Sequence, residues 1–268
     1  AALRAANPRL IVVDISGYGG EGPYAAMKSY DMLVQAETGL ASITGGPEAP
    51  SRVGVSVCDI AAGMYAHQAV LEALIRRTRG GEGAAIEVSL FDGMADWMTV
   101  PLLFSDHGPG APRRVGLSHP SVAPYDPFPS ADGTPVLISI QNDREWRRFC
   151  AEVLERPELA DSPDFASNVQ RVANRARMND LIAAAFARHD TAALCARLLA
   201  AGIAFGRVNS VADFSRHPQL RRVDVATPAG PVAIPAPPPI VDGARAPALG
   251  AVPALDAHGA AIRREFAS

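Results

Sequence analysis

The sequence has 268 residues, of which 48% are hydrophobic and 20% are charged, and its formal net charge is −3. This composition is typical of a globular protein and excludes a chain that is disordered along its length. The small negative charge argues against a nucleic-acid groove or an anionic membrane patch as the main site. No apolar run approaches the roughly 20 residues that span a bilayer, so we expect neither a nucleic-acid partner nor a membrane.

Residues 1–105 alternate strand-like and helix-like patterns, which predicts an α/β fold with a partial Rossmann-like parallel sheet. The strands are expected at 10–15 and 85–90, and the helices at 30–43, 59–79 and 94–104. A glycine-rich loop, 16–20, follows the first strand, at the edge where open α/β sheets bind ligands. Because a helix end and a buried-type strand fall within the first 15 residues, we expect the chain to begin inside a domain.

Three further regions complete the expected organisation. Residues 106–135 are rich in proline and glycine and show no period, so we expect a linker and a site loop. Residues 136–210 begin with a short strand, VLISI, and continue as helices, which predicts an inserted, smaller α+β domain. Its helices are expected near 143–154, 168–188 and 191–201, and its closing strand near 207–209. Residues 211–268 alternate strand-like pieces with prolines, and we expect them to return to the large domain.

The three cysteines are widely spaced, and none has a partner at the spacing of a zinc site. They are Cys58, Cys150 and Cys195. We therefore expect buried, reduced thiols and no metal. The opening residues, AALRAANPRL, lack the apolar core of a signal peptide. Together these features predict a cytoplasmic protein.

Asp59 is the first candidate for chemistry. It follows an apolar, strand-like run at 53–58 and opens the helix with the longest apolar face. Aspartate is a favoured helix N-cap, which would account for this position without any catalytic role. A carboxylate at a helix N-terminus is also held ionised by the helix dipole, and such a carboxylate can attack an activated acyl group. Position alone leaves both interpretations open.

Lys28, Tyr30 and His119 are further candidates. Lys28 is the only lysine in the chain and follows the loop after the first strand, where it is either solvated or in contact with a phosphate. Tyr30 opens the next helix, where an aromatic residue more often packs than binds a ligand. His119 lies in an irregular loop that could cover a site, although a solitary loop histidine is more often solvated. The sequence contains no dinucleotide fingerprint, nucleophile elbow, P-loop or zinc-protease motif.

Taken in order, several stretches of the sequence resemble the class III CoA-transferases, the CaiB/BaiF family that includes formyl-CoA transferase. They are NPRLIVVDISGYGGEGPYAAMKSYDMLVQAETGLASITG, VGVSVCDIAAGMYAHQAVLEAL and GGEGAAIEVSLFDGM. Two later stretches, ISIQNDREWRRFC and FGRVNSVADFSRHPQL, are similar to the small-domain and return segments of that family. The resemblance extends over nearly the whole chain.

The resemblance implies a role for each candidate. Asp59 matches the aspartate that forms a mixed anhydride with the acyl group and then an aspartyl-CoA thioester. A four-residue segment matches one that contacts CoA: Met27, Lys28, Ser29 and Tyr30. The loop from Gly116 to His119 takes the place of a glycine-rich loop that shields the intermediate from water, although GLSHP is poorer in glycine. No permanently bound cofactor is implied, because the CoA thioester is itself a substrate.

The implied reaction transfers CoA from an acyl-CoA donor to a carboxylic acid acceptor. Arginine-rich loops and the HPSVAPY stretch favour a small dicarboxylate as the acid partner. Family members form interlinked homodimers and carry a further N-terminal segment that supplies contacts to the CoA phosphates. We expect this chain to lack that segment, to bind CoA weakly by itself and to be rescued when the segment is supplied.

Two alternatives to a CoA-transferase remain. In the α-methylacyl-CoA racemases of the same superfamily, a histidine stands where this chain has Tyr30, and it works with the aspartate that matches Asp59. Tyrosine is a poor base near neutral pH, which disfavours racemase chemistry. The second alternative is a truncated, non-catalytic chain or a subunit that depends on a partner.

Overall fold

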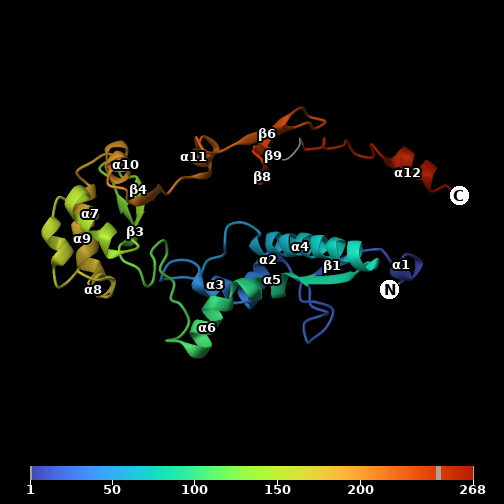
Figure 1. The fold of residues 1–268 in the computed structure, drawn as a ribbon, viewed down its shortest axis with the longest axis horizontal. Helices are drawn as coiled ribbons and strands as arrows, with labels where there is room; N and C mark the ends of the chain where they lie inside the picture. The colour runs from blue at the N-terminus through green and yellow to red at the C-terminus, as the bar shows by residue number, and fades with distance from the viewer. Residues whose placement is uncertain (1, 246–248, 268) are drawn as a thin grey trace. The chain divides into compact units, whose positions relative to one another are not determined.

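The computed structural model describes residues 2–245 and 249–267, and these fall into two compact units that meet in the sequence at Arg207 and Val208 (Figure 1). The first unit begins with a two-stranded parallel sheet of β1 (Val12–Ser16) and β2 (Ala85–Ser89). Val13 lies opposite Ile86 in this pair. The expected parallel α/β arrangement is confirmed for these strands.

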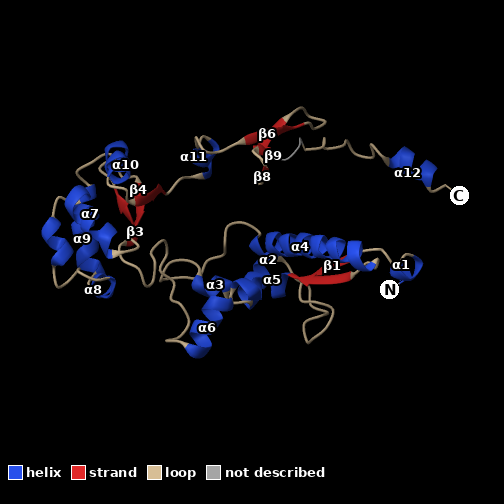
Figure 2. Cartoon of the chain, viewed as in Figure 1, coloured by secondary structure: helices blue, strands red, loops and turns tan. Residues whose placement is uncertain are grey.

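Six helices belong to this part of the first unit (Figure 2). They are α1 (Ala2–Ala6), α2 (Asp31–Glu37), α3 (Leu40–Ile43), α4 (Val57–Gly80), α5 (Leu90–Trp97) and α6 (Thr99–His107). The long helix α4 contacts both strands and α5. A small core forms where α2, α4 and α5 meet: Val34, Val57, Cys58, Ala61 and Met94. This core supports the N-terminal ends of α2 and α4.

Three sequence predictions for this region are wrong in detail. The single helix expected at 30–43 is two helices, because Gly39 takes a left-handed conformation with φ 79° and ends the first. The helix expected at 94–104 is α5 and α6, which share Met98 as their junction. The apolar run at 53–58 is not a strand, since 53–56 is irregular and α4 begins at Val57.

The rest of the first unit is an antiparallel sheet with helices. Its strands, in the order β3-β4-β5, are β3 (Tyr125–Pro129), β4 (Pro135–Ser139) and β5 (Ala204–Arg207). Its helices are α7 (Asp143–Arg148), a π-helix (Phe149–Val153), a 3-10 helix (Pro157–Asp161), α8 (Asn168–Ala173), α9 (Arg175–Phe186) and α10 (Thr191–Ala200). Strand β3 lies inside the stretch expected to be irregular. It tolerates two prolines because it is an edge strand that pairs only with β4.

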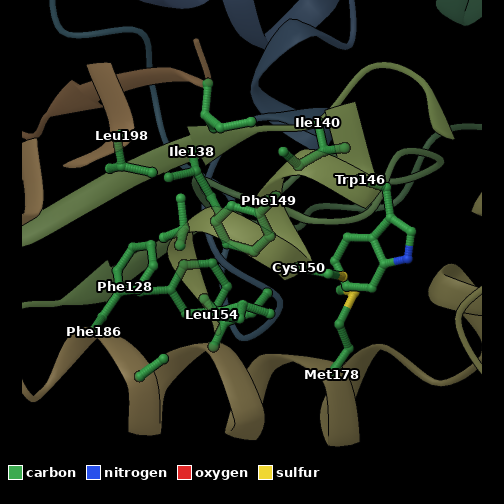
Figure 3. Packing of buried hydrophobic residues seen from close by; sticks show 14 of the residues in the cluster. Phe128, Ile138, Ile140, Trp146, Phe149, Cys150, Leu154, Met178, Phe186 and Leu198 are labelled. Atoms are coloured by element: carbon green, nitrogen blue, oxygen red, sulfur yellow. The ribbon is translucent and has the colours of Figure 1, made fainter. Parts of the chain in front are cut away.

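The largest hydrophobic core lies between this sheet and its helices (Figure 3). Aromatic side chains make up much of it, and five of them are less than 4% exposed: Phe128, Trp146, Phe149, Phe165 and Phe186. Figure 3 shows Cys150 and Met178 beside Trp146. The expected small α+β unit therefore has a core of its own.

The second unit consists of short elements. They are α11 (Val211–Ser215), β6 (Arg222–Val225), β7 (Val232–Pro235), β8 (Ile240–Val241), β9 (Ala244–Arg245) and α12 (Gly259–Glu265). Strands β6 and β7 form an antiparallel hairpin where the sequence predicted two strand-like pieces. The return of residues 211–268 to the large domain stays a prediction. Across the described residues, every helix is too short or too polar to cross a membrane.

Candidate functional site

The loop after β1 is held against the segment that precedes α2. A Cβ atom placed on Gly17 would lie 1.8 Å from the Ser29 Oγ atom, so only glycine allows this approach. The Gly17 carbonyl accepts a 3.0 Å hydrogen bond from the backbone amide of Phe91, at the start of α5. The carboxyl edge of the sheet is therefore in contact with the predicted CoA segment.

That segment, Met27 to Tyr30, is largely open to solvent. Lys28 is exposed, Ser29 is half-buried, and the Tyr30 side chain is 72% exposed. Tyr30 is the N-cap residue of α2, and its carbonyl accepts the amide of Leu33 at 2.9 Å. The aromatic ring is thus not a packing residue, as an aromatic at a helix start usually is, but is available to a ligand.

Asp31 follows Tyr30 and joins α2 to α4. Its side chain is 8% exposed, and its Oδ1 atom accepts a 2.9 Å hydrogen bond from the backbone amide of Cys58. Its Oδ2 atom accepts a 2.8 Å bond from Gln35 Nε2. The Gln35 Oε1 atom in turn accepts the backbone amide of Val53 at 2.8 Å. Two buried side chains of α2 therefore hold the chain that enters α4.

Asp59 is the third residue of α4, not its N-cap, which corrects one of the two interpretations of its position. Ser56 occupies the N-cap position, but its side chain does not cap the helix. The amide of Cys58 is satisfied by Asp31 instead, so the Asp59 carboxylate is not needed as a cap. Asp59 is exposed, and within residues 2–245 and 249–267 its side chain forms no hydrogen bond or ion pair. It stands in the first helical turn, where the dipole favours a negative charge.

Cys58, next to Asp59, has a thiol of low reactivity. It is fully buried. Burial, followed by the negative charge of Asp31 and a hydrogen bond to it, raises the pKa of the Cys58 thiol from 9.0 to about 12. A thiol that stays protonated at neutral pH is a poor nucleophile. Of the two neighbouring side chains, that of Asp59 is the exposed one.

Gly116 and His119 form hydrogen bonds with different parts of the chain. Gly116 has φ 64°, and its amide donates a 2.9 Å hydrogen bond to the Gly45 carbonyl, in the loop between α3 and α4. The His119 Nδ1 atom accepts the amides of Ser121 and Val122 at 3.2 and 3.1 Å.

His119 is half-buried, and its ring is held in its own turn by these two hydrogen bonds. It stacks on the Tyr125 ring with centroids 5.3 Å apart. The His119 carbonyl accepts a 2.8 Å bond from Arg175, which also pairs with Asp126 at 2.9 Å. These contacts tie His119 to β3 and α9.

The structure brings together one part of the predicted site. The segment ending at Tyr30 and the helical turn of Asp59 are linked through the hydrogen bond that the Cys58 amide donates to the Asp31 carboxylate. Among the residues that the structure describes, no hydrogen bond joins Gly116 or His119 to either of them. Sequence reasoning missed Asp31 and Gln35, although their i,i+4 spacing at the start of a helix is a detectable signal.

The described residues contain no group of three or more histidine, cysteine or acidic side chains placed to hold a metal ion. An exposed carboxylate without a partner, at a helix N-terminus and beside a segment with the only lysine of the sequence, is suited to nucleophilic chemistry on a substrate that carries negative charge. Such a carboxylate can form a covalent bond with an acyl group.

Comparisons with known proteins agree on one family. The family model of CoA-transferase family III matches residues 1–259. Acetyl-CoA:oxalate CoA-transferase of Acetobacter aceti is 35% identical over 265 residues, which is 98% of this chain and 68% of that protein. Succinate–glutarate CoA-transferase of Agrobacterium fabrum is 33% identical over 236 residues, 86% of this chain and 58% of that protein. The chain thus spans between about half and two thirds of the length of such relatives.

A solved structure shares the fold over nearly the whole chain. The CaiB/BaiF family protein from Brucella suis superposes with a TM-score of 0.83 at 35% identity, covering 98% of this chain and 70% of that one. A Mycobacterium tuberculosis protein superposes equally well, with a TM-score of 0.83 at 25% identity. The expected family fold is therefore confirmed.

Proposed function

The chain belongs to CoA-transferase family III, and on that basis we propose that it transfers CoA from an acyl-CoA donor to a carboxylic acid, with Asp59 as the nucleophile. The observation that carries this proposal is the exposed carboxylate of Asp59 in the first turn of α4, which has no hydrogen-bond or ion-pair partner among the described residues. The bond from Asp31 to the Cys58 amide holds it near the segment that ends at Tyr30.

The reaction is a series of acyl exchanges on one carboxylate. A carboxylate oxygen of Asp59 attacks the thioester carbonyl of the donor, the C–S bond breaks, and CoA leaves as a thiolate. The thiolate then attacks the aspartyl carbonyl of the mixed anhydride and releases the donor acid, leaving an aspartyl-CoA thioester. The acceptor carboxylate repeats both steps in reverse, so Asp59 is regenerated and no net proton is consumed.

Two further groups of residues serve this chemistry in the proposal. The exposed ammonium of Lys28 and the side chains of Met27, Ser29 and Tyr30 contact CoA, with Lys28 directed to a phosphate. The loop from Gly116 to His119 excludes water from the anhydride, which hydrolyses easily. Neither role requires a resident cofactor.

Small dicarboxylates are the acids that we propose as acceptors. The relatives in Acetobacter aceti and Agrobacterium fabrum are named for oxalate and for succinate and glutarate. A homodimer is proposed on the family resemblance, and a cytoplasmic location remains a prediction from the sequence. A panel of oxalate, succinate, glutarate and acetate as acceptors, with acetyl-CoA and succinyl-CoA as donors, identifies the pair.

Trapping of the acyl-enzyme tests the nucleophile. Protein that is supplied with the N-terminal segment, incubated with acyl-CoA and then treated with hydroxylamine should carry a hydroxamate on Asp59, located by peptide mass spectrometry. Asp59→Asn should remove both the label and CoA transfer. Asp14→Asn, which changes another exposed aspartate at a strand, is the matched control and should keep both. Full transfer activity in Asp59→Asn would contradict the proposal.

Solvent exchange separates transfer from racemisation. In deuterium oxide, a racemase incorporates deuterium at the α-carbon of a 2-methylacyl-CoA. We expect negligible incorporation alongside measurable CoA transfer. Rapid incorporation that depends on Asp59, without transfer to any acid, would overturn the transferase assignment.

A further inference from the structure

We propose that Arg114 is a positioning residue for the transfer reaction: it clamps the anchor of the predicted substrate loop to the loop that leads into the helix of Asp59. The proposal rests on the proposed function. It concerns a residue to which neither the sequence motifs nor the comparisons give a role.

The clamp consists of three hydrogen bonds from one guanidinium group. Arg114 Nη1 donates to the Ser42 carbonyl at 2.9 Å, Nε to the Gly46 carbonyl at 3.1 Å, and Nη2 to the Pro47 carbonyl at 3.2 Å. The side chain is half-buried, and within the described part of the chain it forms no ion pair with an acid. Its charge is therefore directed to backbone carbonyls, and hydrogen bonds from charged donors are stronger than neutral ones.

A backbone hydrogen bond joins the same two segments of the chain. Two residues after Arg114, the Gly116 amide donates to the Gly45 carbonyl at 2.9 Å. Gly45 cannot be replaced without movement, because its φ is 107° and a Cβ atom there would lie 2.7 Å from the Ala49 carbonyl oxygen. The receiving loop is closed at its base by a 2.9 Å bond from the Ser51 amide to the Thr44 carbonyl. Arg114 and Gly116 thus donate hydrogen bonds to a loop, beginning at Thr44, that is already closed by its own backbone.

The other end of this loop leads directly to the proposed nucleophile. The chain at Val53 is fixed by Gln35, and the amide of Cys58 by Asp31. Residues 44–56 are therefore anchored at both ends: by Arg114 and Gly116 at the start, and by α2 at the finish. This arrangement couples the position of the substrate loop to the N-terminus of α4.

The geometry requires arginine at this position. A planar guanidinium group reaches three separate carbonyls at fixed angles, whereas a lysine ammonium on its flexible stem is a single point charge. Loss of the clamp should leave Gly116 free to move away from Gly45. Because the acyl-enzyme anhydride reacts with water, a displaced loop should divert acyl groups from transfer to hydrolysis.

Two measurements on Arg114→Ala test the clamp. Hydrogen exchange by mass spectrometry should show faster exchange in the peptide that contains Gly116. The ratio of acyl-CoA hydrolysis to CoA transfer should rise by about tenfold or more, while KM for acyl-CoA changes by about twofold at most. Arg114→Lys should show an intermediate ratio, and added methylguanidinium should lower the ratio of the alanine variant toward the wild-type value.

The neighbouring Arg113→Ala is the matched control for exchange. Arg113 is exposed, and among the described residues it forms no hydrogen bond or ion pair, so exchange at Gly116 should stay at the wild-type rate. Wild-type exchange in Arg114→Ala would overturn the proposal, because no clamp would exist. Faster exchange with an unchanged ratio of hydrolysis to transfer would also overturn it, since Arg114 would then be structural only.

CoA transfer by the wild-type protein distinguishes a failure of the role of Arg114 from a failure of the proposed function. If wild type, supplied with the N-terminal segment that family members carry, transfers no CoA to any acid of the panel, the proposed function fails and the positioning role fails with it, whatever the exchange data show. If wild type transfers CoA and Arg114→Ala matches it in both measurements, only the role of Arg114 is wrong.

Discussion

The carboxylate of Asp31 accepts a 2.9 Å hydrogen bond from the backbone amide of Cys58, 27 residues further along the chain. This contact replaces the side-chain cap that α4 lacks at Ser56. It also places the residue after Tyr30 against the residue before Asp59. A single buried side chain thereby joins the segment proposed to bind CoA to the helix proposed to carry the nucleophile.

Removal of this carboxylate should destabilise the fold. Asp31→Ala leaves the Cys58 amide and the Gln35 side-chain amide without their acceptor, and an unpaired buried donor costs about 1–3 kcal/mol. We expect the free energy of unfolding to fall by about 2–4 kcal/mol, measured by denaturant titration. Glu37→Ala removes an exposed carboxylate from the same helix and should cost less than about 0.5 kcal/mol. Equal losses in the two variants would contradict this role of Asp31.

The contact between Gly17 and Ser29 predicts a compensating pair of substitutions. Gly17→Ala places a methyl group 1.8 Å from Ser29 Oγ and 2.3 Å from Ser29 Cβ, so the two loops must separate. We expect KM for acyl-CoA to rise by about tenfold, as a displaced binding segment loses contacts worth about 1.4 kcal/mol.

In the double variant, Ser29→Gly should restore the approach of the two loops and return KM to the value of Ser29→Gly alone, because the nearest remaining Ser29 atom in the present structure is Cα at 3.7 Å. Gly20→Ala is the control, since a Cβ atom there meets only Glu87 Oε2 at 3.7 Å. Steady-state kinetics of wild type, Gly17→Ala, Ser29→Gly, the double variant and Gly20→Ala give the KM values for this comparison. A double variant as impaired as Gly17→Ala would show that the steric account is wrong.

The buried thiol of Cys58 predicts a loss of stability in alkaline solution. Its pKa is raised from 9.0 to about 12 in the folded protein, mainly by burial. The folded state therefore holds this proton more tightly than the unfolded state does. The stabilising contribution is complete below pH 9 and is lost as pH rises toward 12.

Denaturant titrations between pH 7 and 11 check this sign. The free energy of unfolding should fall with increasing pH above 9, and Cys58→Ala should make the fall shallower. Burial raises the pKa of Cys150 to about 12 as well, so part of the slope should persist in that variant. Alkylation of Cys58 by iodoacetamide in the native protein near pH 8 would contradict the buried, protonated thiol.

Arg171 should be essential to the stability of the small α+β unit. It is 1% exposed. Its guanidinium donates to the carbonyls of Ala123 and Phe165 at 2.8 and 3.0 Å and to Asp143 at 3.0 Å. Arg171→Met leaves two buried carbonyls unpaired, and we expect a loss of about 3 kcal/mol in the free energy of unfolding.

Arg177→Met is the matched control for Arg171→Met. Its side chain is 69% exposed and pairs with Asp164 at the surface, where an ion pair contributes about 0–1 kcal/mol. Thermal denaturation of both variants gives the comparison. A loss below about 1 kcal/mol in Arg171→Met would show that the buried network is not needed.

Local patterns in the sequence were sufficient for the main elements. The apolar face of the long helix predicted 59–79, and α4 extends over Val57–Gly80; the run LIVVDI predicted the strand that became β1. Such patterns succeed because side-chain periodicity and glycine stops act within a few residues. The family fold was also recognisable from ordered motifs. Position marked Asp59 as a candidate for chemistry, and the resemblance favoured its role as the nucleophile over a helix cap.

Contacts between distant residues decided the rest. The prolines around Phe128 concealed β3, which exists because β4 supplies its partner. Nothing in the sequence indicated that the His119 ring packs on Tyr125 or that its carbonyl accepts a hydrogen bond from Arg175, 56 residues away. The sequence alone determined which residues could react. Tertiary structure decided that Asp59 is an exposed carboxylate and not the cap of α4, because Asp31, from another element, accepts a hydrogen bond from the Cys58 amide.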